Sequence, residues 1–143
     1  MKRTIFILLL ISAVMLAFSA CGMRKPRIED YEWKMRTIMH TEDSQIIYDA
    51  TDEEITTHKQ AKLIDMTLVA KDGKITINDY TNGKTYGGTY TVSGKNPKGT
   101  DYHITIDGKA GFAGVAMTTY ADGTKEETLP ITLGGYSMYF YAE

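Results

Sequence analysis

The residues able to do chemistry are few in this chain, and their spacing matches no catalytic or metal-binding motif. The sequence has one cysteine, Cys21, and three well-separated histidines, His40, His58 and His103. Zinc proteases need paired histidines, as in H-E-x-x-H, and structural zinc sites need several cysteines or histidines. Ser137 lies in Gly-Tyr-Ser-Met-Tyr, which lacks the second glycine of the nucleophile elbow of serine hydrolases. We therefore expect no enzyme activity, no metal and no cofactor.

Residues 1–20 predict an export signal. Lys2 and Arg3 give a positive start, Ile5–Phe18 is apolar apart from one serine, and small residues follow. This three-part layout is typical of a secretory signal peptide. A permanent transmembrane helix fits less well, because the apolar stretch would make a helix of only about 21 Å, whereas the hydrocarbon core of a bilayer is about 30 Å thick.

The segment Phe18-Ser19-Ala20-Cys21 resembles the lipobox of bacterial lipoproteins, and Gly22 after the cysteine also fits. Phe18 departs from the family pattern, which usually has leucine there. The resemblance implies that the signal is removed before Cys21 and that its thiol receives a diacylglycerol unit, often with a further acyl chain on the new N-terminus. Two or three acyl chains anchor a protein stably. The protein would then be lipid-anchored to the bacterial membrane on its extracytoplasmic side. An ordinary cleaved signal with a stray cysteine is the alternative.

Residues 21–30 are expected to hold the lipidated cysteine and a polar tether, because three basic residues surround Pro26 and no apolar periodicity is present. The chain beyond the signal is mildly acidic. Removal of Lys2 and Arg3 leaves 14 basic against 18 acidic residues, a net charge of −4. Duplex nucleic acid is thereby a poor partner, since its phosphates require clustered positive charge. The expected partner is the membrane, reached through the lipid on Cys21.

The composition after residue 22 favours β-sheet. This part contains 18 threonines and 10 tyrosines but only four leucines. β-branched and aromatic residues suit the pleated, half-buried surface of a sheet, whereas a helical bundle would rely on leucine and alanine. Asn or Asp followed by Gly tolerates the positive φ of tight hairpins. Four such turn dipeptides divide the chain: Asp72-Gly73, Asn82-Gly83, Asp107-Gly108 and Asp122-Gly123.

Between the turns, apolar residues alternate with a period of two. Sets that share one face include Tyr31, Trp33, Met35, Thr37 and Met39, then Ile64, Met66, Leu68 and Ala70, then Tyr102, Ile104 and Ile106. The pattern predicts an all-β fold, an up-and-down antiparallel meander of about eight or nine short strands. Closure into a small barrel would hide the edge strands, and a two-sheet sandwich is the second choice. We expect a longer loop at Ser93–Gly99, and one or two helical turns or a loop at residues 51–62.

Three segments are similar to those of small lipocalin-like lipoproteins. They are Trp33-Lys34-Met35, the strand Tyr86–Val92 with its G-T-Y sequence, and the aromatic last strand Tyr136–Tyr141. The resemblance covers residues 31–142, although the chain lacks a clear Gly-x-Trp at the first strand and is short for a full lipocalin. It implies a β-barrel domain, which we place at residues 31–143, and a possible apolar ligand.

The aromatic residues are the candidates for lining a ligand pocket, because each combines an apolar body with a polar group that can orient a ligand. They are Trp33, Tyr86, Tyr90, Tyr102, Tyr120 and Tyr136. The alternative is that they only fill the barrel, since eight strands enclose just enough room for side chains or one small ligand. We thus expect a cell-envelope lipoprotein with a non-catalytic barrel that binds a small apolar ligand or an envelope partner. A solid-core interaction or inhibitor module, using the loops at residues 71–74, 93–100 and 121–125, is the alternative.

Overall fold

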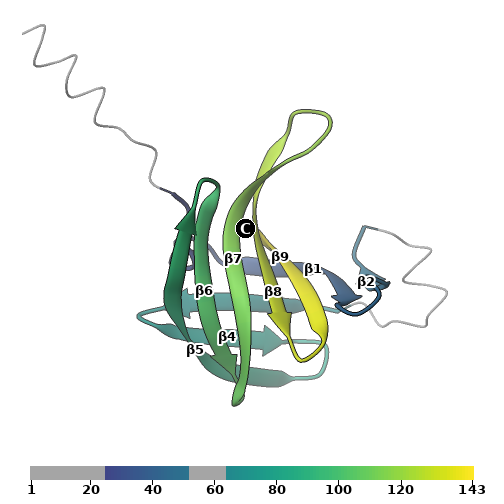
Figure 1. Ribbon diagram of the computed structural model, residues 1–143. Helices are drawn as coiled ribbons and strands as arrows, with labels where there is room; N and C mark the ends of the chain where they lie inside the picture. The colour runs from purple at the N-terminus through teal and green to yellow at the C-terminus, as the bar shows by residue number, and fades with distance from the viewer. Residues whose placement is uncertain (1–24, 52–63) are drawn as a thin grey trace, which may run out of the picture.

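The computed structural model describes residues 25–51 and 64–143, which form nine strands and one short 3-10 helix (Figure 1). The elements are η1 (Ile28–Asp30), β1 (Trp33–His40), β2 (Ile46–Asp49), β3 (Met66–Lys71), β4 (Lys74–Asp79), β5 (Lys84–Asn96), β6 (Gly99–Ile106), β7 (Lys109–Thr119), β8 (Lys125–Leu133) and β9 (Tyr136–Ala142). Consecutive strands from β3 to β9 pair antiparallel, and β9 pairs with β1 to close the sheet. The predicted meander and its closure into a barrel are confirmed.

Strands β2 and β3 share one edge of β1. The start of β1 pairs with β3, with Trp33 opposite Leu68, and the rest pairs with β2, with Thr37 opposite Asp49. The barrel is therefore eight strands around, with one additional strand. The helical turn or loop predicted for residues 51–62 lies, apart from Thr51, outside the described residues.

The inward side chains form one core, and most strands follow the predicted alternation. In β6, Tyr102, Ile104 and Ile106 are buried while His103 and Thr105 are exposed. The largest fully buried side chains are Trp33, Tyr48, Tyr102, Phe140, Ile28, Met35, Leu68, Ile75, Leu129, Ile131 and Val115.

The alternation fails in β1. Its register with β9 shifts between Met35 and Thr37, which marks a bulge. A bulge inserts one residue and reverses which side chains face inward. Ile38 consequently packs against the core. The prediction that Thr37 and Met39 share the face of Trp33 and Met35 is wrong for this reason.

The loop predicted at Ser93–Gly99 is mostly strand. β5 runs to Asn96 and β6 begins at Gly99, so only Pro97 and Lys98 form the turn. Gly99 has another role than loop formation, because a Cβ atom there would lie 1.6 Å from the carbonyl oxygen of Val115. The glycine lets strands β6 and β7 approach closely.

The barrel has two distinct ends. We call the end that η1 fills the plugged end, with η1 as the plug, and the end that contains a hollow the cavity end. At the plugged end, β1 begins and β9 ends, and the turns β3–β4, β5–β6 and β7–β8 are found. At the cavity end lie the turns at residues 41–45, 80–83, 107–108 and 134–135. The start of the described chain, drawn in purple, lies beside the β5–β6 hairpin at the plugged end (Figure 1).

Candidate functional site

The cavity end contains a hollow of about 530 Å³. It lies among the inward-facing side chains that are nearest to the strand ends. Its lining residues are Ile38, Ile47, Met66, Ile77, Tyr86, Ile106, Asp107, Lys109, Leu133, Gly134, Tyr136 and Met138. The volume falls within the range of pockets that hold small organic ligands.

The walls of this cavity are mainly aliphatic. Ile77 and Ile106 are buried at 3% and 4% exposure, whereas Met66, Leu133 and Met138 are only partly buried. Part of their apolar surface therefore faces the cavity and not packed protein. Methionine side chains are unbranched and adapt to irregular shapes, so these walls suit an apolar ligand of variable outline.

Polar groups are confined to a few positions of the lining. Asp107 and Lys109 flank the β6–β7 turn and supply one negative and one positive charge. Tyr86 and Tyr136 contribute phenol groups, and the ring of Tyr136 lies 4.9 Å from that of His40. Few polar groups on an apolar wall can orient a ligand without making the site hydrophilic.

Two tight turns shape the mouth of the cavity. The backbone N–H of Asp107 donates to the carbonyl oxygen of Gly87 at 3.0 Å, and the N–H of Gly87 donates to Asp107 Oδ1 at 3.3 Å. These bonds fix the β6–β7 turn to β5. The β8–β9 turn uses Gly134 and Gly135 at φ of 59° and 85°, where side chains are strained. Gly134 thus presents bare backbone to the cavity.

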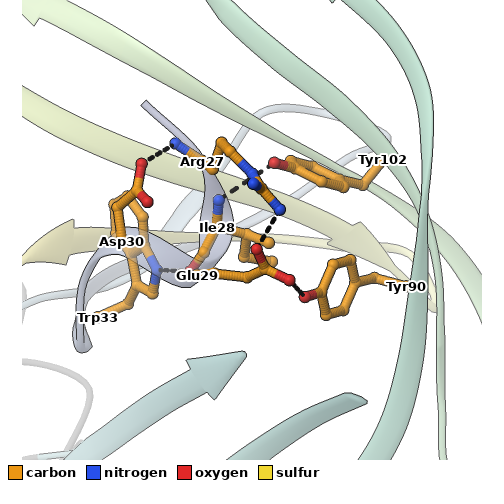
Figure 2. A network of polar contacts seen from close by, with 7 residues as sticks. All are labelled: Arg27, Ile28, Glu29, Asp30, Trp33, Tyr90 and Tyr102. Carbon is orange, nitrogen blue, oxygen red and sulfur yellow. Dashed lines mark hydrogen bonds and ion pairs between the residues drawn. The ribbon is translucent and has the colours of Figure 1, made fainter. Parts of the chain in front are cut away.

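The opposite end is filled by η1, which Figure 2 shows together with the side chains that hold it. Ile28 is 0% exposed. Its N–H donates to the hydroxyl of Tyr102 at 3.1 Å, and its carbonyl oxygen accepts from Trp33 Nε1 at 2.8 Å. Both backbone groups of this buried residue are therefore paired, which removes the cost of leaving them unsatisfied. The predicted tether ends before Ile28, because the apolar residue is part of the core.

A second set of contacts holds Glu29 at the plugged end. The Tyr90 hydroxyl donates to the Glu29 carboxylate, which also pairs with Arg27 (Figure 2). The rings of Tyr90 and Tyr102 meet edge to face at 5.6 Å. Burial, followed by the hydrogen bond to Glu29, raises the pKa of Tyr90 to about 12.

The structure separates the six aromatic residues predicted to line a pocket. Only Tyr86 and Tyr136 lie in the cavity lining. Trp33, Tyr90 and Tyr102 surround the plug at the other end. The sixth residue, Tyr120, lies just after β7, is 39% exposed, and donates its hydroxyl to Glu126 at 2.9 Å.

Most of the lining consists of aliphatic residues that the sequence interpretation did not select for the site. Met66, Leu133 and Met138 have the same inward periodicity as the rest of the core. Their sequence signal is identical to that of packing residues, and only their position at the strand ends leaves them beside empty space.

The remaining points concern the lipidation site, metal binding and membrane-spanning helices. Cys21, the predicted lipidation site, lies outside the described residues. Within residues 25–51 and 64–143, no three His, Cys, Asp or Glu side chains gather closely enough to hold a metal ion. The same residues contain no helix with the length and apolar character needed to cross a membrane.

Comparison with known proteins gave no match to any family model, any curated protein or any solved structure.

Proposed function

We propose that this protein is a cell-envelope lipoprotein whose non-catalytic β-barrel binds a small apolar ligand in the cavity at one end. The cavity of about 530 Å³ with aliphatic walls is the observation that carries the binding function. The export and anchoring part rests on the sequence alone, on the short apolar segment that ends in Ser19-Ala20-Cys21.

The lining defines the class of ligand. Burial of apolar ligand surface against Ile77, Ile106 and Met138 supplies the affinity, at roughly 25 cal/mol per Å². Asp107 and Lys109 lie together at the β6–β7 turn, so a polar group of the ligand has a place near the mouth. The ligand is therefore an apolar or amphiphilic molecule with at most one polar end.

A dye titration with matched variants tests the binding function. Leu133 lines the cavity, whereas its neighbour Thr132 points outward and is exposed. The uncharged dye N-phenylnaphthylamine should gain fluorescence on binding to a soluble form that begins after Cys21. Leu133→Trp should reduce its affinity about tenfold or more by filling the cavity, and Thr132→Trp should leave the affinity unchanged.

Two results would count against the proposal. Absence of dye binding would indicate that the cavity does not accept apolar molecules. Loss of binding in Thr132→Trp but not in Leu133→Trp would place the dye on the outer wall of β8, and the interior would then not be the site.

Detergent partition tests the lipid anchor separately. The full-length protein, expressed in a bacterium, should enter the detergent phase, and Cys21→Ala should remain in the aqueous phase. Partition of the Cys21→Ala variant with membranes would contradict anchoring through this cysteine. The outcome is independent of whether the barrel binds a ligand.

A further inference from the structure

We propose that the plugged end of the barrel lies against an anionic lipid surface and that the cavity faces away from the membrane. The proposal rests on the lipid anchor at Cys21 proposed above. It adds an interaction surface, the hairpin turns of the plugged end, and a partner class, phospholipids with negatively charged headgroups.

The chain between Cys21 and the plugged end is short. Lys25 belongs to the described chain, and Ile28, three residues later, is fixed in the plug. Three residues separate Cys21 from Lys25, and the four steps of the chain between them span at most about 14 Å when fully extended. The eight residues of β6 extend over about 26 Å at 3.3 Å per residue. The tether is therefore too short to run along the wall and bring the cavity end to the bilayer.

The two ends of the barrel differ in charge. Counted with the two residues on either side of each turn, the turns of the plugged end have a net charge of +2: Lys71, Lys74, Lys95, Lys98 and Lys125 against Asp72, Asp122 and Glu126. The described turns of the cavity end have a net charge of −2: Glu42, Asp43, Asp79 and Asp107 against Lys84 and Lys109. The start of the described chain lies beside the β5–β6 hairpin, which carries two of the plugged-end lysines (Figure 1).

Two acidic residues near the plugged end are engaged within the protein. Glu29 pairs with Arg27 and accepts from Tyr90, and Glu126 pairs with Arg36 at 2.9 Å. The excess of lysines lies on two hairpins of the plugged end, β3–β4 and β5–β6. Lysines close to a membrane are attracted by anionic lipids.

Fluorescence quenching from the lipid headgroups tests the orientation. Pro97 lies at the tip of the β5–β6 hairpin at the plugged end, and Gln45 lies in the turn before β2 at the cavity end; both are exposed and uncharged. Pro97→Cys and Gln45→Cys are made in the full-length protein, purified from bacterial membranes and labelled with a thiol-reactive fluorophore. They are then reconstituted in vesicles of phosphatidylcholine and phosphatidylglycerol with a headgroup-attached quencher. We expect severalfold stronger quenching at residue 97 than at residue 45.

The outcomes separate this proposal from the proposed function. Labelling of Cys21 itself, or failure of the protein to stay with the vesicles, would overturn the lipid anchor and the orientation with it. Equal or stronger quenching at residue 45 in a stably anchored protein would overturn the orientation alone.

A charge variant tests the lipid class. Lys71→Gln, Lys74→Gln and Lys98→Gln, combined in Pro97→Cys, should weaken the quenching gained by adding phosphatidylglycerol. The control combination Lys84→Gln and Lys109→Gln at the cavity end should not. Quenching at residue 97 that is the same on pure phosphatidylcholine and insensitive to the lysine changes would overturn the assignment to anionic lipid.

Discussion

The two ends of the barrel are built by the same antiparallel strands but differ in what fills them. At the plugged end, Trp33 and Tyr102 are 0% and 1% exposed and close around Ile28. At the cavity end, Tyr136 is 41% exposed and borders a space of about 530 Å³. The strand pattern alone therefore does not decide whether a barrel end is solid or hollow.

The difference arises from the size of the inward residues and from three residues of the N-terminal segment. Large aromatic side chains converge on η1 at the plugged end. Isoleucine, leucine and methionine at the other strand ends are smaller, and no equivalent segment among the described residues fills the gap between them. Most of the selected aromatic residues thus belong to the core at the plugged end, and only Tyr86 and Tyr136 line the cavity.

Removal of the central side chain of the plugged end should have the largest effect on stability. Trp33→Ala deletes a fully buried ring and the donor to the Ile28 carbonyl. We expect a loss of about 3–5 kcal/mol in the free energy of unfolding, measured by urea denaturation. Tyr136→Ala at the cavity end should cost only about 1 kcal/mol, because that ring is half exposed. Similar losses in both variants would contradict the difference between the ends.

The plug itself can be tested with a smaller change. Ile28→Ala removes buried methylene groups from η1 and should cost about 2–4 kcal/mol. Pro26→Ala, two residues earlier and before the plug, should cost less than about 0.5 kcal/mol. If Ile28→Ala had no effect on the urea midpoint, the segment would be a solvated tether and not part of the core.

A smaller change in the free energy of unfolding should appear at alkaline pH. The pKa of Tyr90 is raised in the folded protein to about 12 from an ordinary 10.0, so folding favours the protonated phenol. Its contribution to stability is complete below pH 10 and is lost as the pH rises towards 12. Tyr90→Phe, which cannot ionise, should reduce the fall in stability between pH 10 and 12. An unchanged pH dependence in this variant would show that Tyr90 is not held at the plug as described.

The sequence was sufficient to predict the strands, their antiparallel order and the closed barrel, because alternation and Asp-Gly or Asn-Gly turns are local signals. The bulge after Met35 was not predicted, since no proline or glycine marks it. Gly99 was interpreted as a loop residue, although its role is a close approach of β6 to β7 that depends on distant residues. Ile28 was placed in the tether because a single apolar residue in a polar segment carries no periodicity.

The residues of the candidate site could also be predicted only in part from the sequence, because long-range contacts decide which inward residues line the cavity. Tyr86 and Tyr136 were selected for their chemistry and do line the cavity. Trp33, Tyr90 and Tyr102 have the same chemistry but contact η1 at the other end. The contact between Tyr90 and Glu29, for example, joins residues more than 60 positions apart in the sequence. Whether an inward residue meets a plug or a cavity is set by such long-range contacts.

The most direct test of the proposed ligand binding in the cavity uses the methionines, which lie in both kinds of environment. Met66 and Met138 line the cavity, whereas Met35 is buried at 1% exposure in the solid part of the core. NMR spectra of isotope-labelled methionine methyl groups, assigned with single Met→Leu variants, would be recorded during titration with N-phenylnaphthylamine. Shifts confined to Met66 and Met138, with Met35 unchanged, are the predicted result. Shifts at Met35 without any at Met66 and Met138, or no shifts at all, would contradict the account.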